Sequence, residues 1–284
     1  MPNFITYYID SMKYLSEDVH SEISDVLDGQ YPAKNKLNLI TKKVRQLISK
    51  GVDTGLESDK PKRGSSRAVY FPKDKKPITI DGIKTTIPTA IKIAFHGALD
   101  NDTGSDRLLG EHQNEHETDG MHQFHAIIRN IHNRGYATNL DGVVAPVMSH
   151  HPDSHWLEMP RTPDLTKSKF KELTKTKDMP KGMDFDRFSN VIMNDHDLSL
   201  GKRPRYSEDK DHDAYMEHPL TNNVLHFSAD TDTHPGDITT IHNWGVFTHP
   251  VTGKEYPVIR DYGYNSNVAK LYHKARYSPS KVFS

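Results

Sequence analysis

The sequence has 284 residues, of which 34% are hydrophobic and 26% charged, with a formal net charge of -1 and no cysteine. This length suits one large domain or two small ones. The near-zero charge excludes a general attraction to nucleic acid or membranes, and the absence of cysteine excludes disulfides, thiolate zinc sites and cysteine nucleophiles.

No apolar run approaches the roughly 20 residues that a membrane-spanning helix needs. The first ten residues lack the basic segment and the apolar core of a signal peptide. A protein of the cytoplasm is therefore expected, with no membrane partner and no clear nucleic-acid binding.

Residues 1–50 are predicted to form a helical extension. Apolar residues recur at helix-like spacing before Pro32, and a clearer amphipathic pattern follows over Lys36–Lys50. This region contains no motif that indicates a function.

From about residue 66 to residue 96 the hydrophobic period changes from helical to alternating. Ala68–Phe71, Pro77–Ile83 and Thr89–Phe95 are predicted strands. Asp81-Gly82 is a typical hairpin turn, so an antiparallel meander is expected.

Two helices and two further strands are expected next. Asp106 can cap a helix over Arg107–Glu117, and Gly120 is predicted to separate it from a second helix that ends at Asn133. The expected strands are Leu140–Met148 and Ser154–Met159.

The C-terminal part is less regular. Short helices are predicted around Phe170 and over Phe185–Ile192, and the charged run from Lys202 to His218 is predicted to be a loop. Further on, the expected elements are strands at Trp244–Phe247 and Tyr256–Arg260, a turn around Pro250 and Gly253 between them, and a helix at Val268–Ala275.

Two candidate binding features lie in the predicted sheet. Small residues in Gly64-Ser65-Ser66 precede a strand that contains Val69, and such a loop lets backbone N–H groups approach a phosphate, although most loops of this kind bind nothing. Lys92 interrupts the apolar strand Thr89–Phe95. A buried lysine needs a partner, and the alternative is a lysine on the outer face that points to water.

The acidic helix after this strand could supply such a partner. Glu111 and Glu115 are four residues apart and share a helix face. The alternative is a solvated acidic helix with no partner in the sheet.

Three aspartates form the most specific pattern. Asp232-Thr-His-Pro-Gly-Asp237 precedes a predicted hairpin, and Asp261-Tyr-Gly263 follows it. Carboxylate oxygens are preferred Mg²⁺ ligands, and a carboxylate can also orient or deprotonate a nucleophile. Each aspartate alone could equally be a turn residue or the end of a strand, but the ordered set of three is harder to explain in that way.

These features together resemble the protein-kinase superfamily, and in particular divergent kinase-like proteins encoded by bacteriophages. The resemblance covers roughly residues 60–265. It implies an α+β, bilobal protein-kinase-like fold. The corresponding domains are an N-terminal helical extension (1–50), an N-lobe of antiparallel sheet plus helix (51–160), and a short, reduced helical C-lobe with the catalytic and metal loops (161–284).

The resemblance also assigns roles within the N-lobe. Ala90-Ile91-Lys92 matches the end of the family's Val-Ala-Ile-Lys motif, so Lys92 would hold the α- and β-phosphates of ATP and pair with a glutamate of the next helix. Glu115 is the first choice for this glutamate and Glu111 the second. The other implied cofactor-binding residues are Gly64, Ser65, Ser66 and Val69 over the phosphates, and Glu158 and Met159 beside the adenine.

In the C-lobe the resemblance makes Asp232 the catalytic aspartate and makes Asp237 and Asp261 the Mg²⁺ ligands. Two departures from the family are visible here. Asp237 stands where the family has asparagine, and 21 residues of this sequence follow Gly263, so the usual peptide-binding helices are expected to be missing or replaced. The glycine-rich loop departs as well, because it holds one glycine where the family usually has three.

The expected function is therefore an ATP/Mg²⁺-dependent phosphotransferase of the serine/threonine-kinase type, encoded by a phage and acting in the host cell. The alternative is a catalytically inactive kinase-fold protein that serves as a virion component or binds a host factor. Lys92, Asp232, Asp237 and Asp261 occur together, and this favours the enzyme. A third interpretation, a metalloenzyme that uses His112 and His116, lacks an identifiable third ligand.

Overall fold

The computed structural model describes residues 39, 42–43, 45–46, 56–58, 60–63, 66–80, 82–94, 110–121, 143–151, 154, 156–203, 212–266 and 268. The chain is mixed α and β and divides into two compact units. The first unit comprises residues 1–118, 146–161 and 267–284, and the second comprises residues 119–145 and 162–266. The predicted domains, in contrast, place 119–145 with the first lobe.

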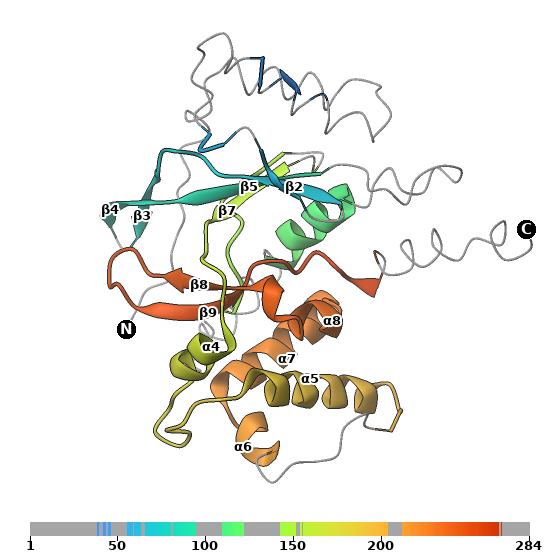
Figure 1. The fold of residues 1–284 in the computed structure, drawn as a ribbon. Helices are drawn as coiled ribbons and strands as arrows, with labels where there is room; N and C mark the ends of the chain where they lie inside the picture. Colours follow the sequence, from blue (N-terminus) through green and yellow to red (C-terminus); the bar gives the residue numbers. More distant parts are fainter. Residues whose placement is uncertain are drawn as a thin grey trace, which may run out of the picture. The chain divides into compact units, whose positions relative to one another are not determined.

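The first unit is built on a five-stranded antiparallel sheet in the order β1-β2-β5-β7-β6 (Figure 1). β5 lies in the middle of the sheet, and all six of its residues are buried, which explains its apolar sequence. The strands are β1 (Lys62–Arg63), β2 (Arg67–Tyr70), β5 (Thr89–Ala94), β7 (Trp156–Pro160) and β6 (Ser149–His150).

The hairpin of β3 (Lys76–Ile80) and β4 (Ile83–Ile87) forms a separate two-stranded sheet. Gly82 lies in the turn with φ 78°, a left-handed conformation that glycine adopts without steric cost. The predicted strands Ala68–Phe71 and Thr89–Phe95 are confirmed as β2 and β5, and Pro77–Ile83 is confirmed as far as Ile80, where β3 ends. The predicted meander is wrong, because β2 pairs directly with β5. Side-chain alternation cannot reveal this pairing, since it reports burial and not the neighbouring strand.

Residues 110–121 form one helix that covers the sheet of the first unit through its N-terminal part. A Cβ atom on Gly110 would lie 2.5 Å from the Ser66 carbonyl oxygen and 3.0 Å from the Ala94 Cβ, so this close approach requires glycine. The predicted break at Gly120 is wrong, because the helix continues through it to Met121. A glycine inside a helix costs only about 1 kcal/mol, which tertiary packing outweighs.

The predicted strand Leu140–Met148 is also wrong over its described residues. Residues 143–148 are irregular and buried, and only Val144 forms an isolated parallel bridge, to Ile259. Their apolar sequence reflects burial rather than a strand. The predicted strand Ser154–Met159 is confirmed as β7.

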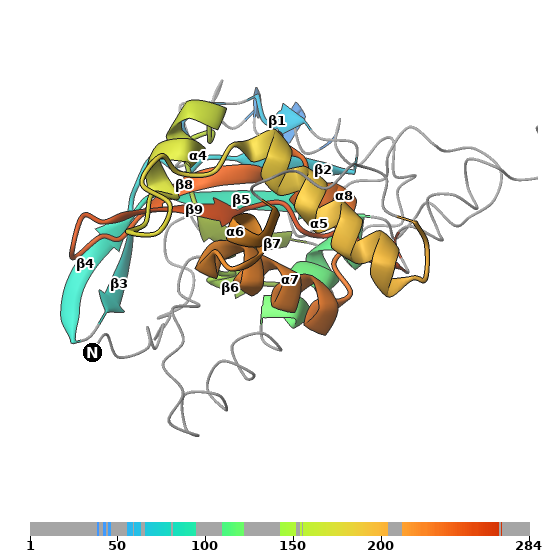
Figure 2. The same ribbon diagram turned by 90° about the horizontal axis from the view of Figure 1, so that it is seen from below.

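The second unit combines helices with the two-stranded sheet β8–β9 (Figure 2). The predicted helices around Phe170 and Phe185 and both predicted strands are confirmed, whereas the predicted loop up to His218 is wrong at α6. The elements are α4 (Lys167–Leu173), α5 (Phe185–Ser199), α6 (His212–Met216), α7 (Pro219–Thr231), α8 (Pro235–Ile238), η2 (Ile241–Asn243), β8 (Trp244–Thr248) and β9 (Glu255–Ile259).

Four aromatic side chains form the core of the second unit. Phe170, Phe185 and Phe188 surround Trp244, with centroid distances of 5.9, 6.1 and 5.8 Å to the indole. The Trp244 Nε1–H donates to the Ile238 carbonyl at 2.7 Å, which satisfies the buried polar atom. This core joins α4 and α5 to β8, and the Trp244–Ile238 hydrogen bond connects it to the end of α8.

The predicted N-terminal helices lie almost entirely outside the described residues. Residues 39, 42–43 and 45–46 are helical, in agreement with the second amphipathic stretch. The predicted helix Val268–Ala275 also lies outside them, except for Val268. Within the part of the chain that the structure describes, no helix combines the length and apolarity that crossing a bilayer requires.

Candidate functional site

Lys92 lies in the central strand β5 and is bound by a carboxylate. Its Nζ donates to both oxygens of Glu117, at 3.0 and 2.9 Å, and the two side chains are 8% and 0% exposed. A lysine so deeply buried keeps its charge only with such a partner. The prediction of a buried, paired lysine is confirmed, and the outward-facing alternative is wrong.

The predicted partners of Lys92 are wrong, because Glu117 takes the place assigned to Glu115 or Glu111. Glu115 is exposed and pairs with the Nδ1 of His112 at 3.1 Å. Two residues correspond to about 200° around a helix, so Glu115 and Glu117 face opposite sides. Gly110, Asn114 and Glu117 lie at positions i, i+4 and i+7 and so share the buried face of the helix. The glycine on this face is the sequence signal that would have identified Glu117 as the buried glutamate.

Arg67 of β2 is a second cation on the same carboxylate, and sequence reasoning missed it. Its Nη2 lies 2.8 Å from Oε1 of Glu117, and its Nη1 donates to the Asn114 Oδ1 at 3.3 Å. Arg67, Lys92 and Glu117 are named here the cation cluster. Two cationic side chains therefore meet at one buried carboxylate.

Strand alternation decides which other residues share the face of Lys92. In the register of the sheet, Lys92 lies opposite Val69 and Leu157, and Ala90 lies opposite Met159, so these side chains line one face. The predicted site residues Val69, which is half-buried, and Met159, which is buried, therefore lie on the face of Lys92. The neighbours of Lys92 on this sheet face are therefore apolar.

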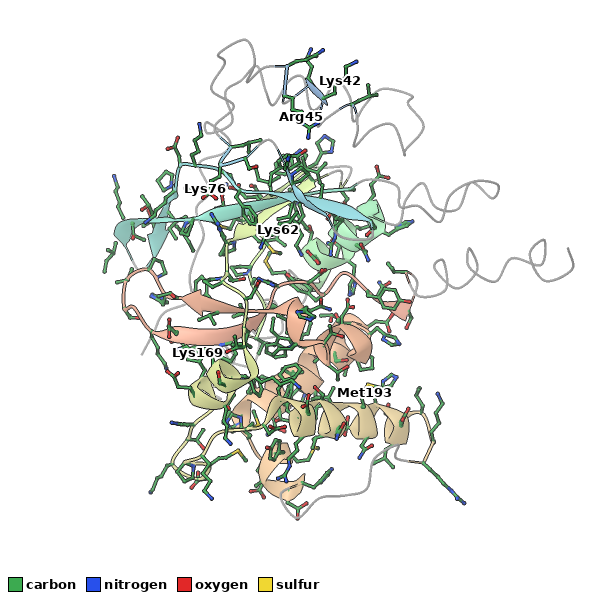
Figure 3. All side chains as sticks on the ribbon, viewed as in Figure 1. Lys42, Arg45, Lys62, Lys76, Lys169 and Met193 are labelled. Atoms are coloured by element: carbon green, nitrogen blue, oxygen red, sulfur yellow. The ribbon has the colours of Figure 1, made fainter. Side chains whose placement is uncertain are left out.

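Glu158 lies on the opposite face of the sheet, paired in register with Ile91. Its carboxylate forms an ion pair with Lys76, which is labelled in Figure 3, and accepts from the Ser149 hydroxyl at 2.6 Å. Its carbonyl accepts from the Met148 amide at 2.7 Å. Strand alternation therefore turns the Glu158 side chain away from the face that carries Lys92.

The predicted phosphate loop is described only at Ser66. This residue is buried, and its hydroxyl donates to the Gln113 Oε1 of the helix that carries Glu117. Gly64 and Ser65 lie outside the described residues. Ser66 therefore connects the loop before β2 to the same helix that Arg67 and Lys92 contact through Glu117.

Asp232 ends helix α7 in the left-handed conformation, with φ 55°. Its side chain is exposed, and its two carboxylate oxygens accept from Ser266, Oδ1 from the hydroxyl at 2.7 Å and Oδ2 from the backbone amide at 3.2 Å. A non-glycine residue with positive φ is uncommon and often marks a functional position.

Asp237 lies in the first turn of the short helix α8 and is half-buried. Its Oδ2 accepts from the Tyr264 amide at 3.0 Å, and its Oδ1 accepts from the Asn243 side-chain amide at 3.4 Å. His234 begins α8 as its N-cap, with Nδ1 accepting from the Gly236 amide at 3.0 Å.

Asp261 lies two residues after the last residue of β9, Ile259, and is half-buried. Its amide donates to the Asn243 carbonyl at 3.3 Å, and the Arg260 amide donates to the same oxygen at 2.7 Å. Asn243, which sequence reasoning missed, therefore contacts both Asp237 and the backbone of Asp261. Asp232, Asp237 and Asp261 are named here the acid cluster.

Two segments distant in sequence are thus held together in the second unit. Residues 232–234 pair with 264–266 through the Thr233–Asn265 bridge and through the His234 amide, which donates to the Tyr264 carbonyl at 2.7 Å. The expectation that the Asp232–Asp237 loop and the Asp261 motif frame a two-stranded turn matches the contacts across β8 and β9.

Among the described residues, no group of three or more His, Asp or Glu side chains could hold a metal ion. A Mg²⁺ site at Asp237 and Asp261 would therefore need phosphate oxygens or water to complete its shell, as is usual for this ion. His112 pairs with Glu115, and the histidine-based metal site finds no third ligand in this part of the chain.

Comparison of the sequence with protein-family models found no match, and comparison with curated protein sequences found none.

Proposed function

We propose that this chain is an ATP/Mg²⁺-dependent phosphotransferase with a protein-kinase-like, bilobal fold. The observation that carries the proposal is the buried ion pair between Lys92 of β5 and Glu117 of the following helix. A lysine fixed in this way presents a positive charge of constant position, which suits the phosphates of a nucleotide.

The surroundings of Lys92 support a nucleotide over a simple anion. Val69, Ala90 and Met159 are apolar and lie on the same sheet face as Lys92, and side chains of this kind suit the flat, apolar adenine ring. Arg67 adds a second positive charge at the cation cluster. An apolar patch beside a cationic one matches the two chemical halves of ATP.

The acid cluster supports metal-dependent transfer. Asp237 and Asp261 would hold Mg²⁺ through carboxylate oxygens, and the bound ion would neutralise charge on the transferred phosphoryl group. Asp232 would orient the acceptor hydroxyl and take its proton. The hydrogen bonds through Asn243 and Tyr264 hold the backbone of these residues in place before any ligand binds.

A second candidate is a kinase-fold protein without catalysis, acting in a virion or on a host or phage protein. One observation favours it: Asp232 and Asp237 already accept hydrogen bonds from Ser266, Tyr264 and Asn243. In that case these carboxylates would serve as helix and loop caps. The proposed site of action for either candidate is the host cell.

The test is binding followed by transfer. MgATP should raise the melting temperature of the wild-type protein, and the shift should be smaller for Lys92→Met. Label from γ-labelled ATP should move to an acceptor with wild-type protein and not with Asp232→Asn. Glu115→Gln, a change at an exposed glutamate of the same helix, is the matched control and should behave as wild type.

The outcomes separate the two candidates. Binding without ATP turnover would support the inactive kinase-fold protein. Absence of any MgATP-dependent shift would contradict the nucleotide site in both candidates.

A further inference from the structure

Ser266 places a hydroxyl group directly on the proposed catalytic carboxylate. Its Oγ donates to the Asp232 Oδ1 at 2.7 Å, and its backbone amide donates to Oδ2 at 3.2 Å. A general base must lie within about 2.6–3.2 Å of the group whose proton it removes. The Ser266 hydroxyl meets this condition without any movement of the second unit.

Ser266 is held in this position by its neighbours. Tyr264 donates its amide to the Asp237 Oδ2 at 3.0 Å and accepts from the His234 amide at 2.7 Å, and Asn265 bridges Thr233. Fixing a nucleophile beside its base removes much of the entropic cost of bringing the two together.

We propose that Ser266 is a phosphorylation site that this chain modifies on itself, with the γ-phosphoryl group of a nucleoside triphosphate. The proposal rests on the proposed function, because it needs Asp232 to act as the base and ATP to be bound. It goes further in naming the acceptor, which is a serine of the same chain.

The step balances without a further reagent. The Ser266 Oγ forms a bond to the γ-phosphorus, the bond from that phosphorus to the bridging β–γ oxygen breaks, and ADP leaves with the electron pair. The hydroxyl proton passes to the Asp232 carboxylate, which returns it to solvent. No oxidation or reduction takes place.

Phosphorylation would also end the contact that allowed it. Phosphoserine carries about -1.5 to -2 charges near neutral pH and no longer has the hydroxyl proton that Asp232 accepts. Repulsion between the phosphate and the Asp232 carboxylate would separate residues 264–266 from residues 232–234. The modified chain would then present Asp232 to another acceptor hydroxyl.

The experiment uses the full chain, γ-labelled ATP and Mg²⁺, with the modified residue located by mass spectrometry of peptides. We expect phosphate on Ser266, a rate per chain that does not depend on protein concentration, and at least about a tenfold loss of label in Asp232→Asn. Ser266→Ala should lose the label and still bind MgATP, and Ser266→Thr should keep it.

Ser228 is the matched control. It lies in helix α7, and its hydroxyl donates to the Thr233 carbonyl at 2.8 Å, so it contacts the same loop but through a carbonyl and not a carboxylate. Ser228→Ala should therefore incorporate label as the wild type does.

Three results would overturn the proposal. In the first, the protein turns over ATP or carries label elsewhere in the chain while Ser266 stays unmodified. Ser266 would then serve only as a cap of the loop, and the proposed function would stand. A rate per chain that rises with protein concentration would contradict transfer within one chain. Absence of MgATP binding would overturn both the proposed function and this site.

Discussion

The cation cluster and the acid cluster are both sets of charged residues, but they are held in opposite ways. Arg67, Lys92 and Glu117 have side chains no more than 8% exposed and are bound to one another by ion pairs. Asp232 is exposed and Asp237 and Asp261 are half-buried, and hydrogen bonds from backbone amides, an amide side chain and a hydroxyl hold the loops that carry them.

This difference has an energetic consequence. A buried charge that loses its partner is costly because water cannot replace that partner, whereas an exposed carboxylate that loses a hydrogen bond is solvated at once. We therefore expect changes at the cation cluster to affect stability and binding together. Changes at the acid cluster should affect chemistry with little effect on stability.

The largest effect is expected for Glu117→Gln, which removes the charge of the carboxylate that Lys92 and Arg67 both contact. Loss of one partner of a buried ion pair typically costs about 3–5 kcal/mol, and this change affects two ion pairs. Urea denaturation followed by circular dichroism measures the change. Glu115→Gln on the exposed helix face should stay within about 0.5 kcal/mol of wild type, and an equal loss there would contradict the comparison.

A smaller loss of stability is expected for Gly110→Ala, which tests how closely the helix of Glu117 approaches the sheet. The new Cβ would lie 2.5 Å from the Ser66 carbonyl oxygen, so the helix must shift. Overpacking of this kind costs about 1–3 kcal/mol, even though alanine favours a helix over glycine. A stabilised Gly110→Ala protein in thermal denaturation would show that the helix is not held against β5.

At the acid cluster, Asp232→Asn should change stability by no more than about 1 kcal/mol, since the amide keeps one acceptor oxygen for Ser266. Phosphoryl transfer should fall by about 10²–10⁴-fold, because the amide cannot take a proton. Parallel measurement of melting temperature and label transfer checks both parts. A large loss of stability would remove the contrast between the two clusters.

The smallest effect concerns pH and helix α7, which ends at Asp232. His218 caps the start of this helix, with Nδ1 accepting from the Leu220 amide at 3.1 Å and Nε2 donating to the Thr174 carbonyl at 2.9 Å. Burial lowers the pKa of His218 below its ordinary value of 6.5, and the hydrogen bond to Thr174 only partly offsets this.

The unfolded chain therefore binds this proton more readily than the folded chain. The contribution of His218 to stability is complete above about pH 6.5 and decreases as the pH falls below that value. Melting temperatures between pH 7.5 and 5 should show this decrease. His218→Asn keeps a capping oxygen but does not titrate, so its curve should be flatter, and an equally steep curve would assign the decrease to other groups.

Much of the local structure could be predicted from the sequence. The strands β2, β5, β7, β8 and β9 follow from short apolar or alternating runs, because a strand buries one or both faces over a few residues. Lys92 stood out for the same reason, since a charge in such a run must have a partner. Gly82 and Gly253 indicated turns because glycine accepts positive φ without steric cost, and in the structure their φ angles are 78° and 69°.

Other features depended on tertiary contacts that the sequence does not display. Residues 143–148 are apolar because they are buried, and this composition led to the incorrect prediction of a strand. The helix that contains Glu117 continues through Gly120, although glycine has a low helix propensity. The choice of Glu117 over Glu115 followed from the helix face that Gly110 places against β5, and Arg67 joined the cluster through the pairing of β2 with β5.

What the sequence alone determined was the chemical inventory and its order: a lysine in an apolar strand, acidic residues in the next helix, and three aspartates around a hairpin. The tertiary structure decided which of these residues meet, because strand register and helix rotation set the direction of every side chain. For that reason Glu158 turned away from Lys92 and Glu117 turned toward it, and Ser266, which no motif marks, came to lie on Asp232.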